Sequence, residues 1–200
     1  KDPSLWLKIQ MNPAVQSLEH RKALIRGLKN DTIQFLATDH APHTLEEKHA
    51  AFAQFADTYP KKSNVERAET IQQKDVQQFY RTCEQNGTSG APWLDVYGLV
   101  CVWLMNTQKF TSQDIVRVAA HNPGKFVNPH LKRQFPKKKY GKGFGEIKKG
   151  FNASFTVLNT RKKTKVTREM VESKCGWSPL EGMTMPGAVE AVFISGKRVK

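Results

Sequence analysis

Residues 32–43 have the sequence TIQFLATDHAPH, and this stretch decides which fold the chain is expected to have. Its first part, Thr32 to Thr38, is β-branched and apolar, which is typical of a strand buried on both faces of a parallel sheet. A carboxylate and two imidazoles follow directly, in Asp39 to His43. Functional side chains gather at the carboxyl ends of parallel strands in α/β folds. The stretch therefore predicts a strand with a candidate site at its end.

The residues before this stretch complete a strand-helix-strand unit. Ser4 to Gln10 predicts a short buried strand, because the chain then reaches Asn12 followed by a proline, which cannot continue a ladder. Apolar residues at helical spacing predict a helix over Leu18 to Leu28, with Asn30 and Asp31 as its stop. Asn12 and Asp39 would thus both follow predicted strands.

Helices are expected after this unit. Thr44 and Glu47 have the spacing of a capping box, so a helix should begin after His43 and run toward Phe55. The polar segment from Tyr59 to Gly87 is expected to be an excursion with some helix. Two further helices are predicted, a buried one over Trp93 to Met105 and one capped by Thr111 and Asp114 that runs through Ala120 and ends at residues 122–124.

The last third of the chain changes from helical to extended periodicity. Residues 153–158 and 188–199, with a turn at Gly196, are expected to be strands of a small β element. We place the boundary between the two parts at residues 125–145. The sequence therefore predicts an α/β protein with a β-rich end.

Composition limits the class of protein. With 200 residues, 38% of them hydrophobic, the chain can form one ordinary domain or two small ones. It contains no apolar run long enough to span a membrane, so a soluble protein is expected. Cys83, Cys101 and Cys175 are an odd number without a C-x-x-C pair, which argues against a disulfide framework and favours a reducing, cytoplasmic setting.

The net charge of +14 is concentrated in one basic strip, Leu131 to Lys165. Within it, only Glu146 opposes the lysines and arginines. Such a strip could follow a phosphate backbone. Its proline and glycines favour instead a solvated connection between two elements, and nucleic-acid binding is not expected.

Asp39 is the strongest candidate for chemistry. A carboxylate at the end of a buried strand is costly unless a cation or a proton donor meets it, and a metal ion is one such partner. The alternative is that Asp39 caps the next helix, with His40 and His43 as ordinary loop residues. A catalytic zinc needs at least three protein ligands, and the chain has neither an H-x-H nor an H-E-x-x-H motif. A zinc site would therefore be incomplete in this sequence.

Several motifs, taken in order, resemble dihydroorotase. The resemblance is specific, because the related hydantoinases and allantoinases usually lack the second histidine of Asp-His-Ala-Pro-His. The matching stretches span nearly the whole chain and are Met11 to Ala14, Ala37 to His43 with Glu46 to Lys48, Thr88 to Pro92, His121 to Phe126, Gly145 to Gly150, Lys174 to Gly182, and Val192 to Lys197.

The resemblance implies a fold, a reaction and a set of roles. The fold would be the carboxyl-terminal half of an amidohydrolase (β/α)8 barrel of the TIM type, with the barrel part at residues 1–140 and part of a small composite β domain at 141–200. The reaction would be the interconversion of N-carbamoyl-L-aspartate and dihydroorotate in de novo pyrimidine biosynthesis. Asp39 would be a metal ligand and the general base, and the substrate would be held by Asn12, His43, Ser89 and Gly90.

The resemblance also implies what this chain lacks. The other ligands of one or two zinc ions would lie upstream, so the chain would be part of a longer enzyme and need the missing amino-terminal half as its partner. A homodimer is left open. The alternative function is a catalytically silent dihydroorotase-like subunit that supports another enzyme of the pyrimidine pathway, such as aspartate transcarbamoylase.

Overall fold

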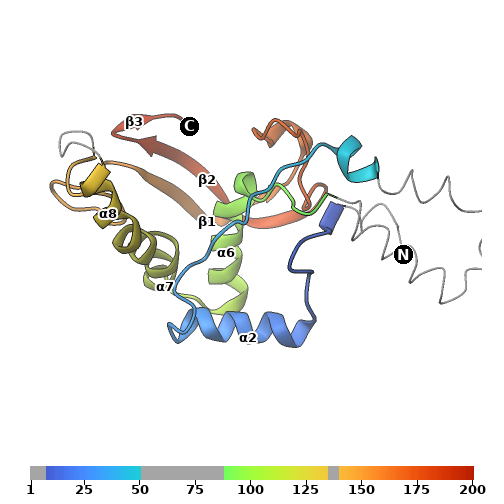
Figure 1. Cartoon of the computed structure of the whole chain (residues 1–200), viewed down its shortest axis with the longest axis horizontal. Coiled ribbons are helices and arrows are strands. Elements are labelled where there is room, and N and C mark those ends of the chain that lie inside the picture. Colours follow the sequence, from blue (N-terminus) through green and yellow to red (C-terminus); the bar gives the residue numbers. More distant parts are fainter. Residues whose placement is uncertain (1–7, 51–87, 135–139) are drawn as a thin grey trace, which may run out of the picture. The chain divides into compact units, whose positions relative to one another are not determined.

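The computed structural model describes residues 8–50, 88–134 and 140–200 (Figure 1). These residues form two compact units, each assembled from separate stretches of the chain. The described part of the first unit comprises residues 8–15, 39–50, 88–95 and 168–181, and that of the second comprises 16–38, 96–134, 140–167 and 182–200. The predicted division of the chain at residue 140 concerns the complete fold and stays a prediction.

Within its described residues, the second unit contains four α-helices: α2 (Leu18–Lys29), α6 (Tyr97–Gln108), α7 (Ser112–Val116) and α8 (Asn122–Gln134). The predicted helix over residues 18–28 is confirmed, because Ser17 caps α2 by accepting a hydrogen bond from the His20 N–H and Asn30 ends it. A single 3-10 turn, η1 (Leu94–Val96), precedes α6, so the predicted buried helix over residues 93–105 is confirmed with a later start.

The strands of the second unit form a three-stranded antiparallel sheet in the order β1-β2-β3. Its strands are β1 (Phe155–Lys165), β2 (Thr184–Ile194) and β3 (Lys197–Arg198). In the register Phe155 lies opposite Phe193, and their rings stack at 4.6 Å between centroids. The predicted β element is confirmed, and the first two strands are longer than the sequence suggests.

Helix α6 packs against the hairpin of β1 and β2 (Figure 1). Its sequence is apolar around most of its circumference, and the side chains of Leu99, Cys101, Val102 and Leu104 are buried. Gly187 of β2 allows the close approach, because a Cβ there would lie 2.6 Å from the Val102 side chain. A core cluster joins α6 to its neighbouring helices and consists of Leu28, Cys101, Leu104, Phe110, Ile115 and Val118.

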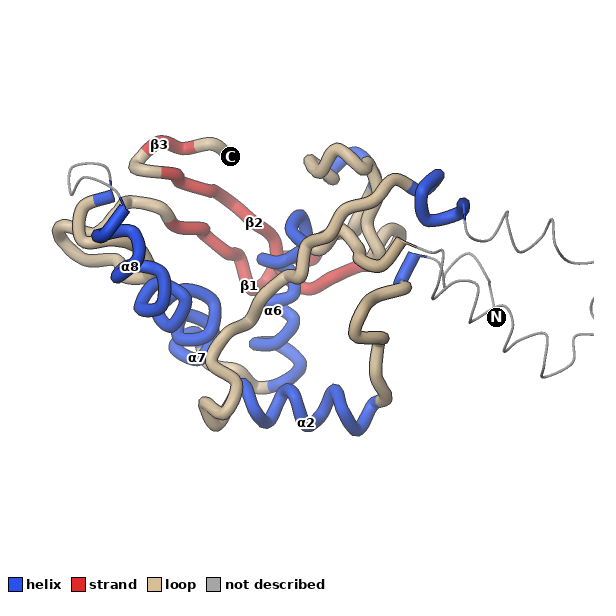
Figure 2. The backbone as a smooth tube through the Cα atoms, in the orientation of Figure 1, coloured by secondary structure: helices blue, strands red, loops and turns tan. Residues whose placement is uncertain are grey.

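The predicted strand over residues 32–38 is wrong for the described structure. This segment is a loop after α2 (Figure 2), and its main chain bonds to helical neighbours. The Leu36 N–H donates to the Val118 carbonyl at 3.0 Å, and the Leu36 carbonyl accepts from the Tyr97 hydroxyl at 2.7 Å. A strand requires a neighbouring strand for its ladder, and the described residues provide none beside this segment.

The predicted helix stop at residues 122–124 is also wrong. The Thr111–Asp114 capping box begins α7 as expected, but the chain continues through a π-helical turn, η2 (Arg117–His121), directly into α8. Pro123 lies in the first turn of α8 directly after η2, where the wider π-helical turn already interrupts the regular hydrogen-bond ladder that a proline cannot join. Gly124 has a packing role, since a Cβ there would lie 2.4 Å from the Phe144 carbonyl oxygen.

The first unit contains little regular structure in its described part. Residues 8 and 9 are helical, so the predicted strand over residues 4–10 is wrong at these positions, and its other residues except Gln10 lie outside the described part. Residues 45–50 are helical, and η3 (Arg168–Met170) is a single 3-10 turn. The capping box that begins the helix is confirmed: the Thr44 N–H donates to Glu47 Oε2 at 2.9 Å and the Glu47 N–H to Thr44 Oγ1 at 3.1 Å. The segment over residues 59–87 lies outside the described part.

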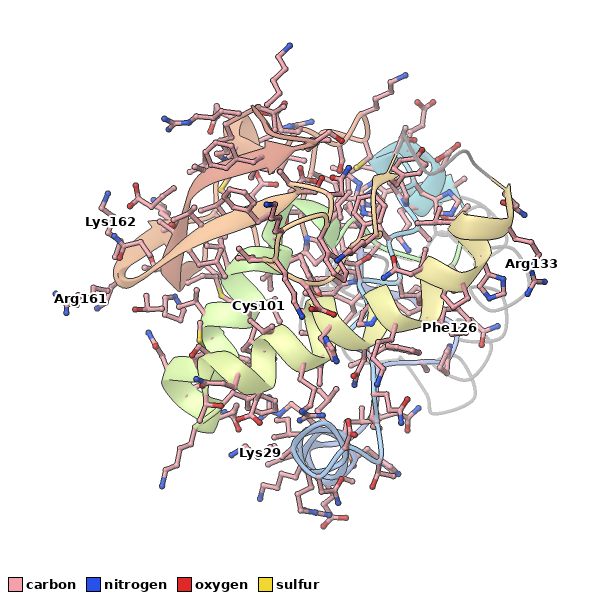
Figure 3. The ribbon with its side chains drawn as sticks, turned by 90° about the vertical axis from the view of Figure 1, so that its left-hand side faces the viewer. Lys29, Cys101, Phe126, Arg133, Arg161 and Lys162 are labelled. Carbon is pink, nitrogen blue, oxygen red and sulfur yellow. The ribbon has the colours of Figure 1, made fainter. Side chains whose placement is uncertain are left out.

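The basic strip lies partly in the second unit. Residues 141–150 form turns, as expected of a connection, while its last basic residues belong to β1. Arg161 and Lys162 project outward from the β1–β2 hairpin (Figure 3), and Lys162 Nζ pairs with the Glu190 carboxylate at 2.8 Å. None of the helices within the described ranges has the length and apolar character needed to cross a membrane.

Candidate functional site

All five site residues predicted from the sequence, Asn12, Asp39, His43, Ser89 and Gly90, fall in the first unit. Asn12, Asp39 and Ser89 are exposed, His43 is partly buried, and Gly90 is buried. Three separate stretches of the chain carry them. The structure joins these stretches by hydrogen bonds of their main chain, so it places the predicted residues around one junction.

The junction brings the backbone at residues 10, 40–41 and 90–91 together. The Gly90 N–H donates to the Gln10 carbonyl at 3.0 Å. The Ala41 N–H donates to the Ala91 carbonyl at 3.3 Å, and His40 and Ala91 form a parallel β-bridge. Ser89 and Asp39 each stand next to a bonded residue, and Asn12 lies two residues after Gln10.

Gly90 fits the junction because it has no side chain. Its φ is +122°, and a Cβ would lie 2.5 Å from the Cβ of Ala41 and 2.7 Å from its carbonyl oxygen. Because the Gly90 N–H already bonds to Gln10, this donor is used within the protein. Its contribution to a binding site is therefore structural, while the neighbouring Ser89 is exposed and can reach a ligand.

Asp39 adopts a left-handed backbone conformation with a φ of +46°. Non-glycine residues with positive φ are uncommon, and those held there by their surroundings are concentrated at functional sites. His40, the next residue, is paired with Ala91, so the left-handed residue directly precedes the junction. The exposed carboxylate can thus meet a ligand or an incoming proton.

His40 has a structural role. Its Nδ1 accepts a hydrogen bond from the Leu94 N–H at 3.1 Å, which places the ring proton of the neutral form on Nε2. With one ring nitrogen occupied and the other protonated, this imidazole is not available as a metal ligand. The interpretation of His40 as an ordinary loop residue is therefore the better one.

His43 lies at the start of the helix over residues 45–50. Its carbonyl accepts a hydrogen bond from the indole N–H of the fully buried Trp177 at 2.7 Å. Its Nδ1 lies 3.4 Å from Glu47 Oε2. The Thr44 N–H bond, with a smaller contribution from His43, holds the pKa of Glu47 below its usual value. The His43 imidazole thus lies beside the Glu47 carboxylate.

Lys48 is the residue that sequence reasoning missed. Its side chain is only 1% exposed, and Nζ donates to the carbonyls of Gln10 at 3.1 Å, Thr88 at 2.8 Å and Gly90 at 2.7 Å. A lysine in a short capped helix normally faces solvent, so its helix does not distinguish it, although it ends one of the motif stretches. Trp177 was also missed, although it lies in one of the motif stretches.

The described residues do not by themselves make a zinc site. Asp39 is a suitable carboxylate ligand, but no group of three or more His, Cys, Asp or Glu side chains within the described ranges could hold a metal ion. A catalytic zinc needs three protein ligands. Asp39 can therefore supply at most one of them.

Solved structures of hydantoinases share the fold of this chain. The D-hydantoinase of a Thermus species has a TM-score of 0.64 over 96% of this chain and 33% of its own, at 16% sequence identity. The L-hydantoinase of Arthrobacter aurescens has a TM-score of 0.63 over 98% of this chain and 35% of its own, at 18% identity. These values establish a shared α/β fold for the corresponding third of the molecule.

Sequence comparison identifies the more particular relative. The chain is 28% identical over 191 residues to the dihydroorotase of Clostridium acetobutylicum and 28% identical over 185 residues to that of Archaeoglobus fulgidus. A shorter stretch of 46 residues is 56% identical to the dihydroorotase of Bacillus licheniformis. No protein-family model matches the chain. The resemblance to dihydroorotase drawn from the motifs is confirmed.

The chain spans about a third of the length of these relatives. The match with the Clostridium acetobutylicum protein covers 95% of this chain and 34% of that protein. The expectation that the chain corresponds to half of a dihydroorotase is therefore corrected to about a third, the carboxyl-terminal part.

Proposed function

We propose that this chain is the carboxyl-terminal part of a dihydroorotase, a hydrolase that interconverts N-carbamoyl-L-aspartate and dihydroorotate in cytoplasmic pyrimidine biosynthesis. The observation that carries the proposal is the match to dihydroorotases over 95% of the chain. In the complete protein, the chain would supply the last strands of a (β/α)8 barrel and part of a small β domain. The extended segment over residues 32–38 would then find the strand neighbours that the described residues lack.

The proposed reaction requires a base, and we assign this role to Asp39, whose side chain is exposed. A water molecule attacks the ring carbonyl of dihydroorotate, and Asp39 takes the proton that the water loses. The carbon–nitrogen bond then breaks, and Asp39 returns the proton to the departing nitrogen. The reverse sequence closes the ring, so one carboxylate serves both directions.

The substrate is an anion, and the first unit offers groups suited to it. His43 can donate to a substrate carboxylate when its ring is protonated, and Asn12 and Ser89 are exposed hydrogen-bonding residues on neighbouring stretches. The net charge of +14 attracts anions in general. Dihydroorotate carries a carboxylate that hydantoin lacks, and its ring has six members where the hydantoin ring has five.

Zinc, as one or two ions, is part of the proposal, with Asp39 as one ligand and the remaining ligands outside the described residues. A bound zinc ion polarises a carbonyl group and lowers the pKa of water. The partner implied is the rest of the same enzyme, and a homodimer would be compatible with it.

The decisive test is the complete protein that carries this chain, assayed on dihydroorotate and on hydantoin, beside its Asp39→Asn variant. Asparagine accepts a left-handed conformation as readily as aspartate, so the substitution removes the charge with little strain. We expect turnover of dihydroorotate in preference to hydantoin, and a loss in kcat of about 10²- to 10⁴-fold in the variant.

Asp31→Asn is the control for an exposed aspartate at positive φ, here +66°, and because it removes the ion pair with Arg117, its free energy of unfolding is measured beside kcat. It should leave kcat unchanged. Near-normal turnover by Asp39→Asn would remove Asp39 from the role of base. Absence of turnover in the zinc-loaded complete protein would favour a catalytically silent subunit.

A further inference from the structure

Lys48 is a buried cation whose position the proposed reaction does not explain. Lysine is almost never fully buried unless it is paired, because burying an ammonium group costs free energy. Burial lowers the pKa of Lys48 to about 8, so the ammonium form still dominates at neutral pH. None of the ion pairs formed among the described residues involves it.

Three carbonyl oxygens take the place of a carboxylate partner. An ammonium group has three N–H donors and no acceptor, and Nζ of Lys48 has three acceptors, at 2.7, 2.8 and 3.1 Å. The number of donors equals the number of acceptors. A neutral amine has two N–H groups and a lone pair, so it could satisfy only two of these carbonyls.

The three carbonyls come from the stretches that carry the predicted substrate-binding residues. Gln10 lies two residues before Asn12, and Thr88 and Gly90 flank Ser89. The Gln10 carbonyl also accepts from the Gly90 N–H at 3.0 Å, so the two stretches are bonded to each other as well as to Lys48. Lys48 itself lies one turn after His43. A single ammonium group thus links all of these stretches.

We propose that Lys48 is a positioning residue that, through its three carbonyl contacts, holds the main chain so that Asn12, Ser89 and His43 can bind substrate together. The expected effect of Lys48 on KM rests on the proposed function. Its structural consequence, a rigid junction of residues 10 and 88–90, follows from the hydrogen bonds alone.

The test replaces the ammonium by an apolar group of similar length, Lys48→Met, in the complete protein. We expect KM for dihydroorotate to rise roughly tenfold or more while kcat changes less, because the groups that bind substrate lose their alignment. Amide hydrogen exchange at Gly90, whose N–H bonds to Gln10, should become at least about tenfold faster at an unchanged global stability. Lys125→Met is the control, because Lys125 is exposed on α8.

Two further variants keep the proposal testable if Lys48→Met does not fold. Lys48→Arg retains the positive charge and several N–H donors, and should preserve KM better than Lys48→Gln, which is neutral with two donors. The proposal would be overturned if Lys48→Met, or Lys48→Gln in its place, had the KM and the Gly90 amide exchange rate of the unmodified protein. If the unmodified protein hydrolyses no cyclic amide, the proposed function fails, while the exchange rate at Gly90 still decides whether Lys48 holds the junction.

Discussion

At the scale of single residues, the first unit has two kinds of polar group. Some form hydrogen bonds within the protein, and others are exposed on side chains. The Gly90 N–H, the His40 ring and the Lys48 ammonium are all committed to internal hydrogen bonds. The side chains of Asn12 and Asp39, in contrast, are exposed. Chemistry is therefore expected from the exposed residues, and geometry from the committed ones.

His43 gives a prediction at this scale. In the complete protein, His43→Ala should raise KM for dihydroorotate roughly 10- to 100-fold, the cost of a hydrogen bond to a charged group, with a smaller effect on kcat. Steady-state kinetics on dihydroorotate and on an uncharged cyclic amide would measure the effect. The increase should be confined to the substrate that bears a carboxylate.

The control for this variant is His130→Ala, since His130 is exposed on α8. An equal rise in KM for both substrates in His43→Ala would argue that the histidine supports the loop and does not contact the carboxylate.

At the scale of elements, short-range capping determines where helices begin, and packing determines where they end. Thr111 and Asp114 form a complete capping box at α7, and Arg117 then bonds to the Asp31 carboxylate and the Leu28 carbonyl. These bonds tie the end of α2 to the α7–η2 region. The helical path continues through Pro123, and Gly124 leaves room for the close approach of the Phe144 carbonyl to α8.

The capping box gives a prediction about pH. The Thr111 N–H bond, followed by the Thr111 hydroxyl, lowers the pKa of Asp114 below its usual 3.8. A carboxylate whose pKa is lowered on folding contributes stability above that usual value and loses it as the pH falls through the folded pKa. Asp114→Asn should therefore lower the free energy of unfolding by about 0.5 to 1 kcal/mol at pH 7, since the carboxylate is partly solvated.

Denaturant unfolding of the complete protein at pH 7, 5 and 3 would measure this difference, which should shrink below about pH 3.8. Glu181→Gln serves as the control, because Glu181 is exposed. A difference between Asp114→Asn and the parent that stays constant down to pH 3 would contradict the assignment.

At the scale of the whole molecule, the described residues leave much apolar surface uncovered. Large hydrophobic side chains with more than half of their surface exposed include Val15, Leu18, Leu24, Phe126 and Ile147. Single exposed apolar residues are normal, but so many within a chain that spans a third of its relatives suggest surfaces that the rest of the protein covers.

This gives a prediction for the isolated chain. Expressed alone, the 200 residues should bind a hydrophobic dye and self-associate, because their exposed apolar side chains lack partners. Light scattering and dye fluorescence, compared with those of the complete protein, would measure this. A monodisperse 200-residue monomer that unfolds cooperatively and binds no dye would sink the idea that the chain needs the rest of the enzyme.

The features that the sequence predicted correctly depend on near neighbours in the chain. The capping boxes at Thr44 and Thr111 use hydrogen bonds that span three residues, and the strands of the β element lie where the sequence changes from helical to extended periodicity. The motif around Asp39 is likewise contiguous, so it identified the resemblance to dihydroorotase without any knowledge of contacts.

Other features required the tertiary structure, because they depend on residues far apart in the chain. The bonds of Leu36 to Val118 and Tyr97 explain why residues 32–38 do not form a strand in the described structure. Lys48 reaches carbonyls 38 to 42 residues away, and its helix does not distinguish it from a solvated lysine. By itself the sequence determined where several helices begin, the β element and the chemical groups of the candidate site, whereas long-range hydrogen bonds decided that residues 32–38 form a loop and that the Lys48 ammonium and the Gly90 N–H belong to the framework.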